Sequence, residues 1–222
     1  MAMFGRRRFS PFIGAALVLA ASLSTARPAV AQEGIDRPIG RFVVDVRGSI
    51  TPFGDNSEFS ALRGFNASVT PGLGLGLEAG AHVYVYRWRV ITFGLGGSVH
   101  ASLGDRGASE LDVNPDGPII RQQLVAVSPQ LSFNFGGRDG WSYISGGLGN
   151  SRLSLFALGT DNTERQTKTL NYGGGARWFT GDHIAFSLDL RFYALTPLEQ
   201  TDTEPGSPRM TVMVLNIGAS FR

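Results

Sequence analysis

The sequence contains no cysteine, which excludes disulfide bonds, thiolate metal sites and a lipid-modified N-terminal cysteine. It contains one lysine, Lys168, although the surface of a soluble protein usually carries many charged side chains. After residue 31, no segment reaches the roughly 18 consecutive apolar residues that a membrane helix needs. These absences argue against a disulfide-stapled secreted module and against a helical membrane protein.

The first 31 residues have the organisation of a secretory signal peptide. Residues 6–8 are arginines, residues 12–21 are apolar, and residues 29–31 read Ala-Val-Ala, a small-residue cleavage site. Cleavage there would leave 191 residues starting at Gln32, which suits one domain. We therefore predict a chain exported through the inner membrane.

The basic isoelectric point of 9.3 belongs to this leader. Four of the 20 basic residues lie within it and all 18 acidic residues follow it, so the mature chain would have 16 basic and 18 acidic residues. A nearly balanced charge gives no support to nucleic-acid binding, and we predict no nucleic-acid partner.

One segment of the chain alternates strictly between apolar and small or polar residues. The odd-numbered residues from Leu73 to Val85 are leucine, alanine or valine, and the residues between them are glycine or polar. Because strand side chains alternate between faces, this segment has one apolar face. Its 13 residues exceed the ~9–11 that a tilted strand needs to cross a bilayer.

The same pattern recurs, and we predict eight strands, at residues 41–51, 72–86, 89–103, 120–135, 141–155, 168–179, 183–194 and 210–222. Glycines blur the fifth segment, so ten strands stay an alternative. Pro129 in the fourth segment predicts a β-bulge. The connections between the predicted strands are alternately long and short. This is typical of outer-membrane barrels, in which the short turns lie in the periplasm and the long loops lie outside the cell.

Facing residues in an antiparallel ladder point to the same side, so a turn between two strands with the same parity of polar residues must hold an odd number of residues. The second and third strands are both polar at even positions and the sixth and seventh are both apolar there, and residues 87–89 and 180–182 fit this requirement. Aromatic residues favour membrane–water interfaces. We therefore predict a membrane-interface girdle near the short turns, made of Phe42, Trp88, Trp141, Trp178 and Phe221.

The second face of the strands decides which side meets lipid. It is mostly Gly, Ser, Thr and Asn, whereas a soluble exterior would show many Lys and Glu. We predict that it lines the lumen, where its isolated charges form a network of Asp45, Arg47, Glu78, His82, Arg177, Asp189 and Arg191. The alternative is a secreted lipocalin-like barrel whose apolar face encloses a small apolar ligand.

Residues 41–222 resemble the small OmpA/OmpX-like outer-membrane β-barrel family. The resemblance rests on the alternating strands, the run Ser-Tyr-Ile-Ser-Gly-Gly-Leu-Gly at 142–149 and the ending Leu-Asn-Ile-Gly-Ala-Ser-Phe-Arg at 215–222. It implies an all-β, closed antiparallel eight-stranded up-and-down transmembrane barrel, preceded by a short segment at residues 32–40. It also implies contact with the barrel-assembly machinery, which reads a terminal aromatic; here Phe221 is followed by Arg222.

Catalysis has one candidate constellation. The parity of strands two and three places Glu78 opposite Ser98 with His100 diagonal to it, which a lipid hydrolase could use. We interpret these residues instead as a luminal hydrogen-bond network and predict no catalysis. His82 and His183 are isolated, so we predict no metal site and no cofactor. An eight-stranded interior has room only for side chains, which predicts little steady conductance.

The long loops are the other functional candidate, because three of them are net acidic. From the sequence we predict a monomeric outer-membrane protein that is surrounded by outer-membrane lipids and has a structural or cell-surface interaction role. An acidic surface could bind an extracellular partner that is basic, or divalent cations. The charged loop residues are Asp55, Glu58 and Arg63; Asp105, Arg106, Glu110, Asp112 and Asp116; and Glu199, Asp202, Glu204 and Arg209.

Overall fold

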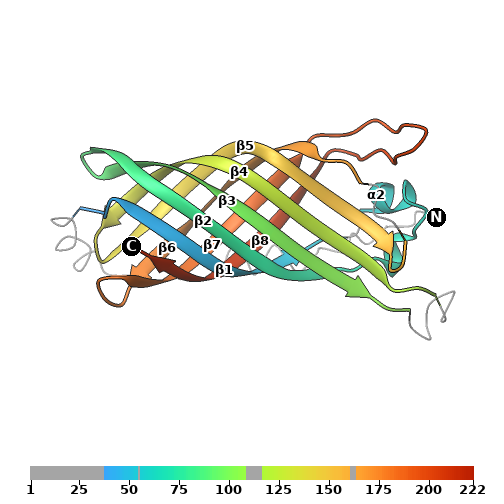
Figure 1. The fold of residues 1–222 in the computed structure, drawn as a ribbon, viewed down its shortest axis with the longest axis horizontal. Coiled ribbons are helices and arrows are strands. Elements are labelled where there is room, and N and C mark those ends of the chain that lie inside the picture. The colour runs from blue at the N-terminus through green and yellow to red at the C-terminus, as the bar shows by residue number, and fades with distance from the viewer. Residues whose placement is uncertain (1–37, 55, 109–116, 161–163) are drawn as a thin grey trace, which may run out of the picture. The chain divides into compact units, whose positions relative to one another are not determined.

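The computed structural model describes residues 38–54, 56–108, 117–160 and 164–222. The predicted signal peptide, most of the short segment after it, and the loop acids Asp55, Glu110, Asp112 and Asp116 lie outside these residues. Within them the chain forms eight strands. Figure 1 shows how they wrap around one barrel. These are β1 (Phe42–Pro52), β2 (Leu73–Trp88), β3 (Ile91–Arg106), β4 (Ile120–Gly137), β5 (Gly140–Ala157), β6 (Thr167–Phe179), β7 (Ile184–Leu195) and β8 (Met210–Phe221).

The strands form one closed antiparallel sheet in which every strand pairs with its neighbours in sequence. The seam is the pairing of β1 with β8, which runs from Val44 opposite Phe221 to Ile50 opposite Leu215. This closed up-and-down barrel confirms the predicted fold class. All eight predicted strands are present, with boundaries that differ from the prediction by a few residues.

The turn between β2 and β3 departs from the sequence prediction. Arg89 and Val90 form a two-residue turn, in which Arg89 takes a positive φ of 52°. A bulge between Tyr84 and Tyr86 supplies the odd residue that the parity argument requires. The predicted three-residue turn at 87–89 is therefore wrong, although the parity of the two strands is preserved.

The predicted bulge at Pro129 is also wrong. The register between β4 and β5 is the same before and after Pro129, and only the ladder between Val127 and Leu131 is interrupted. Proline has no N–H to donate to a ladder. Gly147 lets β5 pass close by, because a Cβ there would collide with the carbonyl oxygen of Pro129.

The connection between β1 and β2 contains two short helical segments, α2 (Ser57–Ala61) and η3 (Ala67–Val69), which the sequence analysis did not predict. The side chain of Asn56 caps α2 by accepting a hydrogen bond from the backbone N–H of Phe59 at 2.9 Å. Among the described residues, no helix has the length and apolar character needed to cross a membrane.

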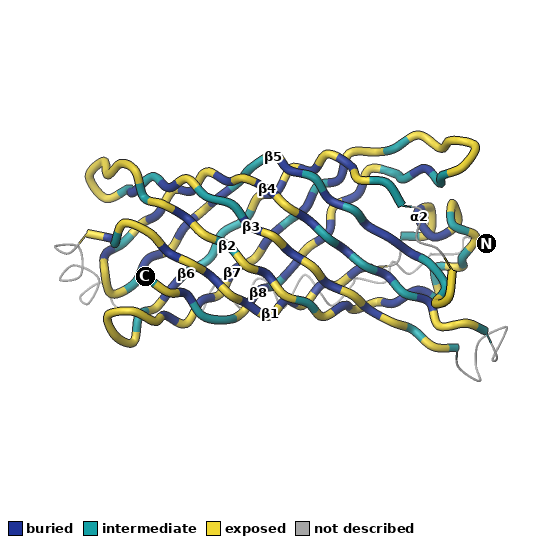
Figure 2. Tube along the Cα trace, in the orientation of Figure 1, coloured by how far each residue is buried: buried dark blue, intermediate teal, exposed yellow. Residues whose placement is uncertain are grey.

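The polarity of the barrel is inverted relative to a soluble protein. Exposed and buried residues alternate along the strands, as Figure 2 shows. The exposed members are largely apolar, such as Leu77, Val99 and Leu131, whereas the buried members include Asp45, Arg47 and many Ser, Thr and Asn residues. A lipocalin-like barrel would need the opposite arrangement, with its apolar face inward.

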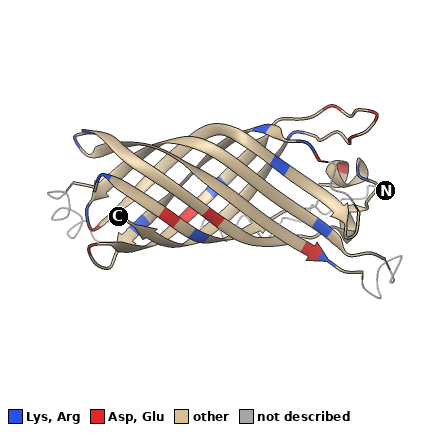
Figure 3. Cartoon of the chain, viewed as in Figure 1, with Lys and Arg blue, Asp and Glu red and all other residues tan. Residues whose placement is uncertain are grey.

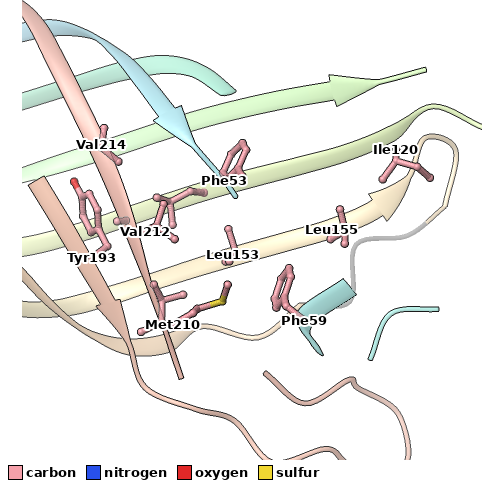
Figure 4. Packing of buried hydrophobic residues seen from close by; sticks show 12 residues of the cluster. Phe53, Phe59, Ile120, Leu153, Leu155, Tyr193, Met210, Val212 and Val214 are labelled. Carbon is pink, nitrogen blue, oxygen red and sulfur yellow. The ribbon is translucent and has the colours of Figure 1, made fainter. Parts of the chain in front are cut away.

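Two apolar clusters lie inside the barrel, one toward each end. The cluster at the short-turn end contains Ile39, Val43, Trp141 and Tyr143. The cluster at the long-loop end is larger, and Figure 4 shows most of its members. It consists of Phe53, Phe59, Ile120, Leu124, Ala126, Leu153, Leu155, Tyr193, Leu195, Met210, Val212 and Val214.

We expect Leu77→Arg to lower the free energy of unfolding by about 2–4 kcal/mol, because a charge would enter the lipid-facing band. Leu77 is 67% exposed on the outer surface of β2. The measurement is urea unfolding of the protein refolded into phospholipid vesicles. Val90→Arg, in the short turn after β2, is the matched control and should cost much less. Equal losses for the two variants would contradict a lipid-facing band.

Candidate functional site: the luminal network and the long-loop mouth

Charged side chains from β1, β2, β6 and β7 meet inside the barrel. In Figure 3, the acidic and basic segments of neighbouring strands are grouped in the part of the barrel nearer the short turns. The strand registers contribute to this grouping. Arg47 lies opposite Glu78 in the ladder of β1 and β2, and Arg177 lies opposite Ser187 in the ladder of β6 and β7. The six residues involved are almost fully buried, and they are Asp45, Arg47, Glu78, Arg177, Asp189 and Arg191.

Asp45 is the most heavily bonded member of this network. It accepts hydrogen bonds from Nε and a terminal nitrogen of Arg177 at 2.9 and 2.6 Å, and from the hydroxyl of Ser220. Arg47 lies 2.6 Å from the same carboxylate and donates to Glu78 at 2.7 Å. Arg47 thereby joins two carboxylates of adjacent strands.

Asp189 and Arg191 form the second half of the network. Asp189 accepts hydrogen bonds from Tyr143 at 2.6 Å, from Arg191 at 3.0 Å and from Asn216 at 3.1 Å. Arg191 also donates to Asn171 and Ser145, each at 2.9 Å. Both charges are therefore surrounded by polar partners, which offsets the cost of removing them from water.

The network balances in charge, since three carboxylates meet three guanidinium groups. One of these ion pairs, Asp45–Arg177, joins β1 to β6, two strands that are not neighbours in the sheet, so the network fills and braces the barrel. Arg177 also stacks over the ring of Tyr143, with its guanidinium carbon 4.0 Å from the ring centroid. The charged groups are therefore paired with each other, and this pairing can stabilise the barrel.

His82 differs from the rest of the predicted network. It lies inside the barrel and is buried, but neither of its ring nitrogens has a hydrogen-bond partner among the described residues. The sequence analysis grouped His82 with the charged network; it lies in the lumen near these charges but forms no hydrogen bond or ion pair with them in the described part of the chain, and Gly96 opposite it presents no side chain. Within the described ranges, no group of three or more histidine or acidic residues is placed to hold a metal ion.

The candidate hydrolase residues share one luminal face, but no hydrogen bond or ion pair joins any two of them in the described part of the chain. Glu78 lies opposite His100, and Ser98 lies opposite Gly80, because the turn at Arg89–Val90 and the bulge in β2 together give a register two residues away from the one that the sequence suggested. The Ser98 hydroxyl accepts a hydrogen bond from Gln130 at 2.7 Å. His100 contacts Ser102 at 3.1 Å and Ser49 at 3.4 Å. The predicted positions of Ser98 and His100 relative to Glu78 are therefore wrong.

The aromatic girdle divides into two groups. Phe42, Trp88, Trp178 and Phe221 point outward and are 41–55% exposed. Trp141 is 3% exposed and points into the lumen, where it stacks on Phe179 at a centroid distance of 5.0 Å. Including Trp141 in a lipid-facing girdle is therefore wrong. The glycines of β5 have no side chain, so the sequence pattern did not show which face of this strand is outward.

The mouth at the long-loop end is closed by the segment between β1 and β2. Phe59 of α2 is 1% exposed within the larger apolar cluster. Arg63 follows it and holds Glu164 in a bidentate ion pair, with one nitrogen 2.6 Å from the carboxylate. It also donates to the Ser207 hydroxyl at 2.9 Å and the Gly206 carbonyl at 3.2 Å. Arg63 thus ties three long connections together.

Sequence reasoning missed the apolar lining at this end. The available signal was the loss of alternation where strands approach the long loops, as in Leu124–Val127 of β4 and Val212–Leu215 of β8. Both faces of those segments are apolar because one belongs to the apolar outer surface of the barrel and the other meets Phe53 and Phe59. No comparable signal marked Arg63, whose partners come from distant loops.

Comparison with known proteins gave matches by structure alone. No family model and no curated protein sequence matches this chain. Ail, the attachment invasion locus protein of Yersinia pestis, was solved with the heparin analogue sucrose octasulfate. It is 12% identical with a TM-score of 0.52, and the match covers 82% of this chain and 98% of Ail. The fold is that of a small eight-stranded outer-membrane barrel.

Two further barrels resemble this chain more loosely. Neisserial surface protein A is 12% identical with a TM-score of 0.46, and the match covers 81% of this chain and 94% of that one. OprG of Pseudomonas aeruginosa is 12% identical with a TM-score of 0.45, over 83% and 96% of the two chains. Together with the closed topology, the likeness to Ail confirms the architecture that the sequence resemblance implied.

We expect Asp45→Ala to lower the free energy of unfolding by about 3–5 kcal/mol, because Arg177 would lose its only acidic partner in the described network. Urea unfolding followed by tryptophan fluorescence measures this. Arg121→Ala, which breaks the exposed ion pair with Asp105, is the control and should change little. A loss no larger than that of the control would show that the network does not brace the barrel.

We expect Arg63→Ala to make the loop between β1 and β2 about ten times more sensitive to proteinase K, since it removes charge-assisted bonds to two other loops. Cleavage of the folded protein in vesicles, followed on gels, measures this. Arg209→Ala, an exposed arginine at the same end, is the control. Unchanged cleavage in Arg63→Ala would mean that the mouth is held shut by Phe59 alone.

Proposed function

We propose that this protein is an integral outer-membrane barrel with its short turns in the periplasm and its long loops at the cell surface. The observation that carries this proposal is the inverted polarity, with apolar residues such as Leu77 outside and the ion pairs of Asp45 and Arg177 inside. In hydrocarbon such an outer surface is stable, and a closed ladder leaves no unpaired edge. Phe42, Trp88, Trp178 and Phe221 then lie at one membrane–water interface.

We propose further that the barrel is monomeric and acts through its long loops in cell-surface interaction. Arg63 and Glu164 hold three connections in a fixed arrangement around a pocket of about 430 Å³. Two acidic side chains of the last loop line this pocket, namely Asp202 and Glu204, of which Glu204 is paired with Arg165. A fixed acidic surface favours a basic extracellular partner, and the luminal network has no catalytic part in this role.

Assembly of the barrel is the remaining part of the proposal. Phe221 ends β8 with its ring on the outer surface and pairs with both Val44 and Ile184. This position at the seam supports recognition of β8 by the barrel-assembly machinery after export. Outer-membrane lipids are the partners of the apolar surface.

The absence of native cysteine makes the topology directly testable. We expect Thr203→Cys, in the exposed loop between β7 and β8, to react with a membrane-impermeant maleimide in intact cells. Asp139→Cys, in the exposed turn between β4 and β5, should react only after the outer membrane is permeabilised. The opposite labelling pattern would reverse the orientation, and labelling of both sites in a periplasmic extract would contradict membrane insertion.

A further inference from the structure

A cavity of about 300 Å³ opens at the short-turn end of the barrel. It lies between the residues that precede β1, the turn after β4 and the turn after β6. Three arginines line it, namely Arg41, Arg138 and Arg222, together with His183. Asp182 is the one carboxylate of its described lining. The side chains around the cavity therefore carry an excess of positive charge.

Arg222 is held by the protein and shapes the cavity wall. Its guanidinium donates to the carbonyl oxygens of Asp182 at 2.8 Å and of Arg138. It also stacks over Phe179, with its central carbon 3.6 Å from the ring centroid. Partial burial, and then the charge of Arg138, lower the pKa of the Arg222 guanidinium from its ordinary value, while Asp139 and Asp182 act in the opposite direction.

Arg41 and Arg138 are available to a ligand. Arg41 has no ion pair with any residue in the described ranges, and its backbone is fixed at the rim because its carbonyl accepts a hydrogen bond from Tyr84 at 2.8 Å. Arg138 pairs with Asp182 at 2.9 Å, but the two side chains are 44% and 71% exposed. An ion pair so exposed contributes little and can be exchanged for a stronger anionic partner.

The position of the cavity indicates which anion would reach it. Phe42 lines the cavity and is 52% exposed on the outer surface, in the group of aromatic residues that we place at the membrane interface. The cavity therefore borders the level at which lipid headgroups lie. Arginine binds phosphate well because its planar group offers several donors in a fixed geometry.

We propose that this cavity binds the phosphate of an anionic phospholipid headgroup from the periplasmic leaflet, with Arg41 and Arg138 as the donors. The proposal rests on the membrane orientation given under Proposed function. It gives the barrel a lipid-specific contact at the end opposite to the surface loops. Phosphatidylglycerol is the probe, and phosphatidylcholine is the lipid that should not be retained.

The test compares the lipids that remain bound after gentle detergent extraction from mixed phosphatidylcholine–phosphatidylglycerol bilayers, counted by native mass spectrometry. We expect the protein to retain phosphatidylglycerol selectively. Arg41→Gln/Arg138→Gln should lower this retention by about tenfold. Arg87→Gln/Arg89→Gln removes the same charge from the end of β2 and the turn after it, outside the cavity, and should retain the lipid.

Three outcomes would overturn the proposal. The first is equal loss in both double variants, which would indicate a general basic surface. The second is equal retention of the two lipids by the unmodified protein. The third is a rise in the thermal midpoint of unfolding with inorganic phosphate that equals the rise with short-chain phosphatidylglycerol, which would indicate a free-anion site.

Folding is checked separately for every variant by the gel shift that a closed barrel shows on boiling in SDS. A protein that shifts on boiling but retains both lipids equally overturns the lipid site and leaves the membrane barrel intact. A protein that shows no shift and is recovered in periplasmic extract overturns the proposed function itself.

Discussion

Backbone hydrogen bonding is the constraint on which the rest of this structure depends. In hydrocarbon each unpaired amide costs several kcal/mol, so a sheet that spans a membrane must close. The seam between β1 and β8 meets this requirement over Val44–Ile50. Closure with eight strands then fixes a narrow interior, which side chains must fill. The glycines opposite large luminal residues, such as Gly218 beside Arg47, follow from that lack of space.

The interior is filled in layers that differ in chemistry. Aromatic residues such as Trp141 close the short-turn end, ion pairs around Asp45 and Asp189 occupy the next layer, and Phe59 with its apolar neighbours closes the long-loop end. Charge can be placed in such an interior only if it is balanced and hydrogen-bonded, which accounts for three arginines meeting three carboxylates. His100 lies at the boundary between layers, bonded to Ser102 on one side and against the Tyr193 ring on the other.

The sequence predicted the features that repeat and missed those that occur once. Alternation along Leu73–Val85 follows from an apolar outer face and a polar lumen, so the strand positions and the inward face of Arg47 could be predicted directly. The two-residue turn at Arg89–Val90 and the bulge at Tyr84–Tyr86 occur once, without any proline or glycine to mark them, and together they changed the predicted facing of Glu78 and Ser98. Trp141 was assigned to the wrong face of β5 because the glycines of this strand have no side chain to indicate which face is outward.

The two ends of the barrel differ in a way that separates its roles. Arg63 donates hydrogen bonds to the connections after β5 and β7, and to Phe59 in its own loop, so side chains hold much of the long-loop end in place. One backbone bridge, between Leu198 and Ser207, adds to them. At the opposite end Arg222 holds turns through backbone carbonyls, which any turn sequence provides. The interior between these ends is occupied by buried ion pairs and apolar side chains. In the proposed function, recognition therefore takes place at the two ends of the barrel and on its apolar outer surface, where the exposed charges and aromatic rings lie.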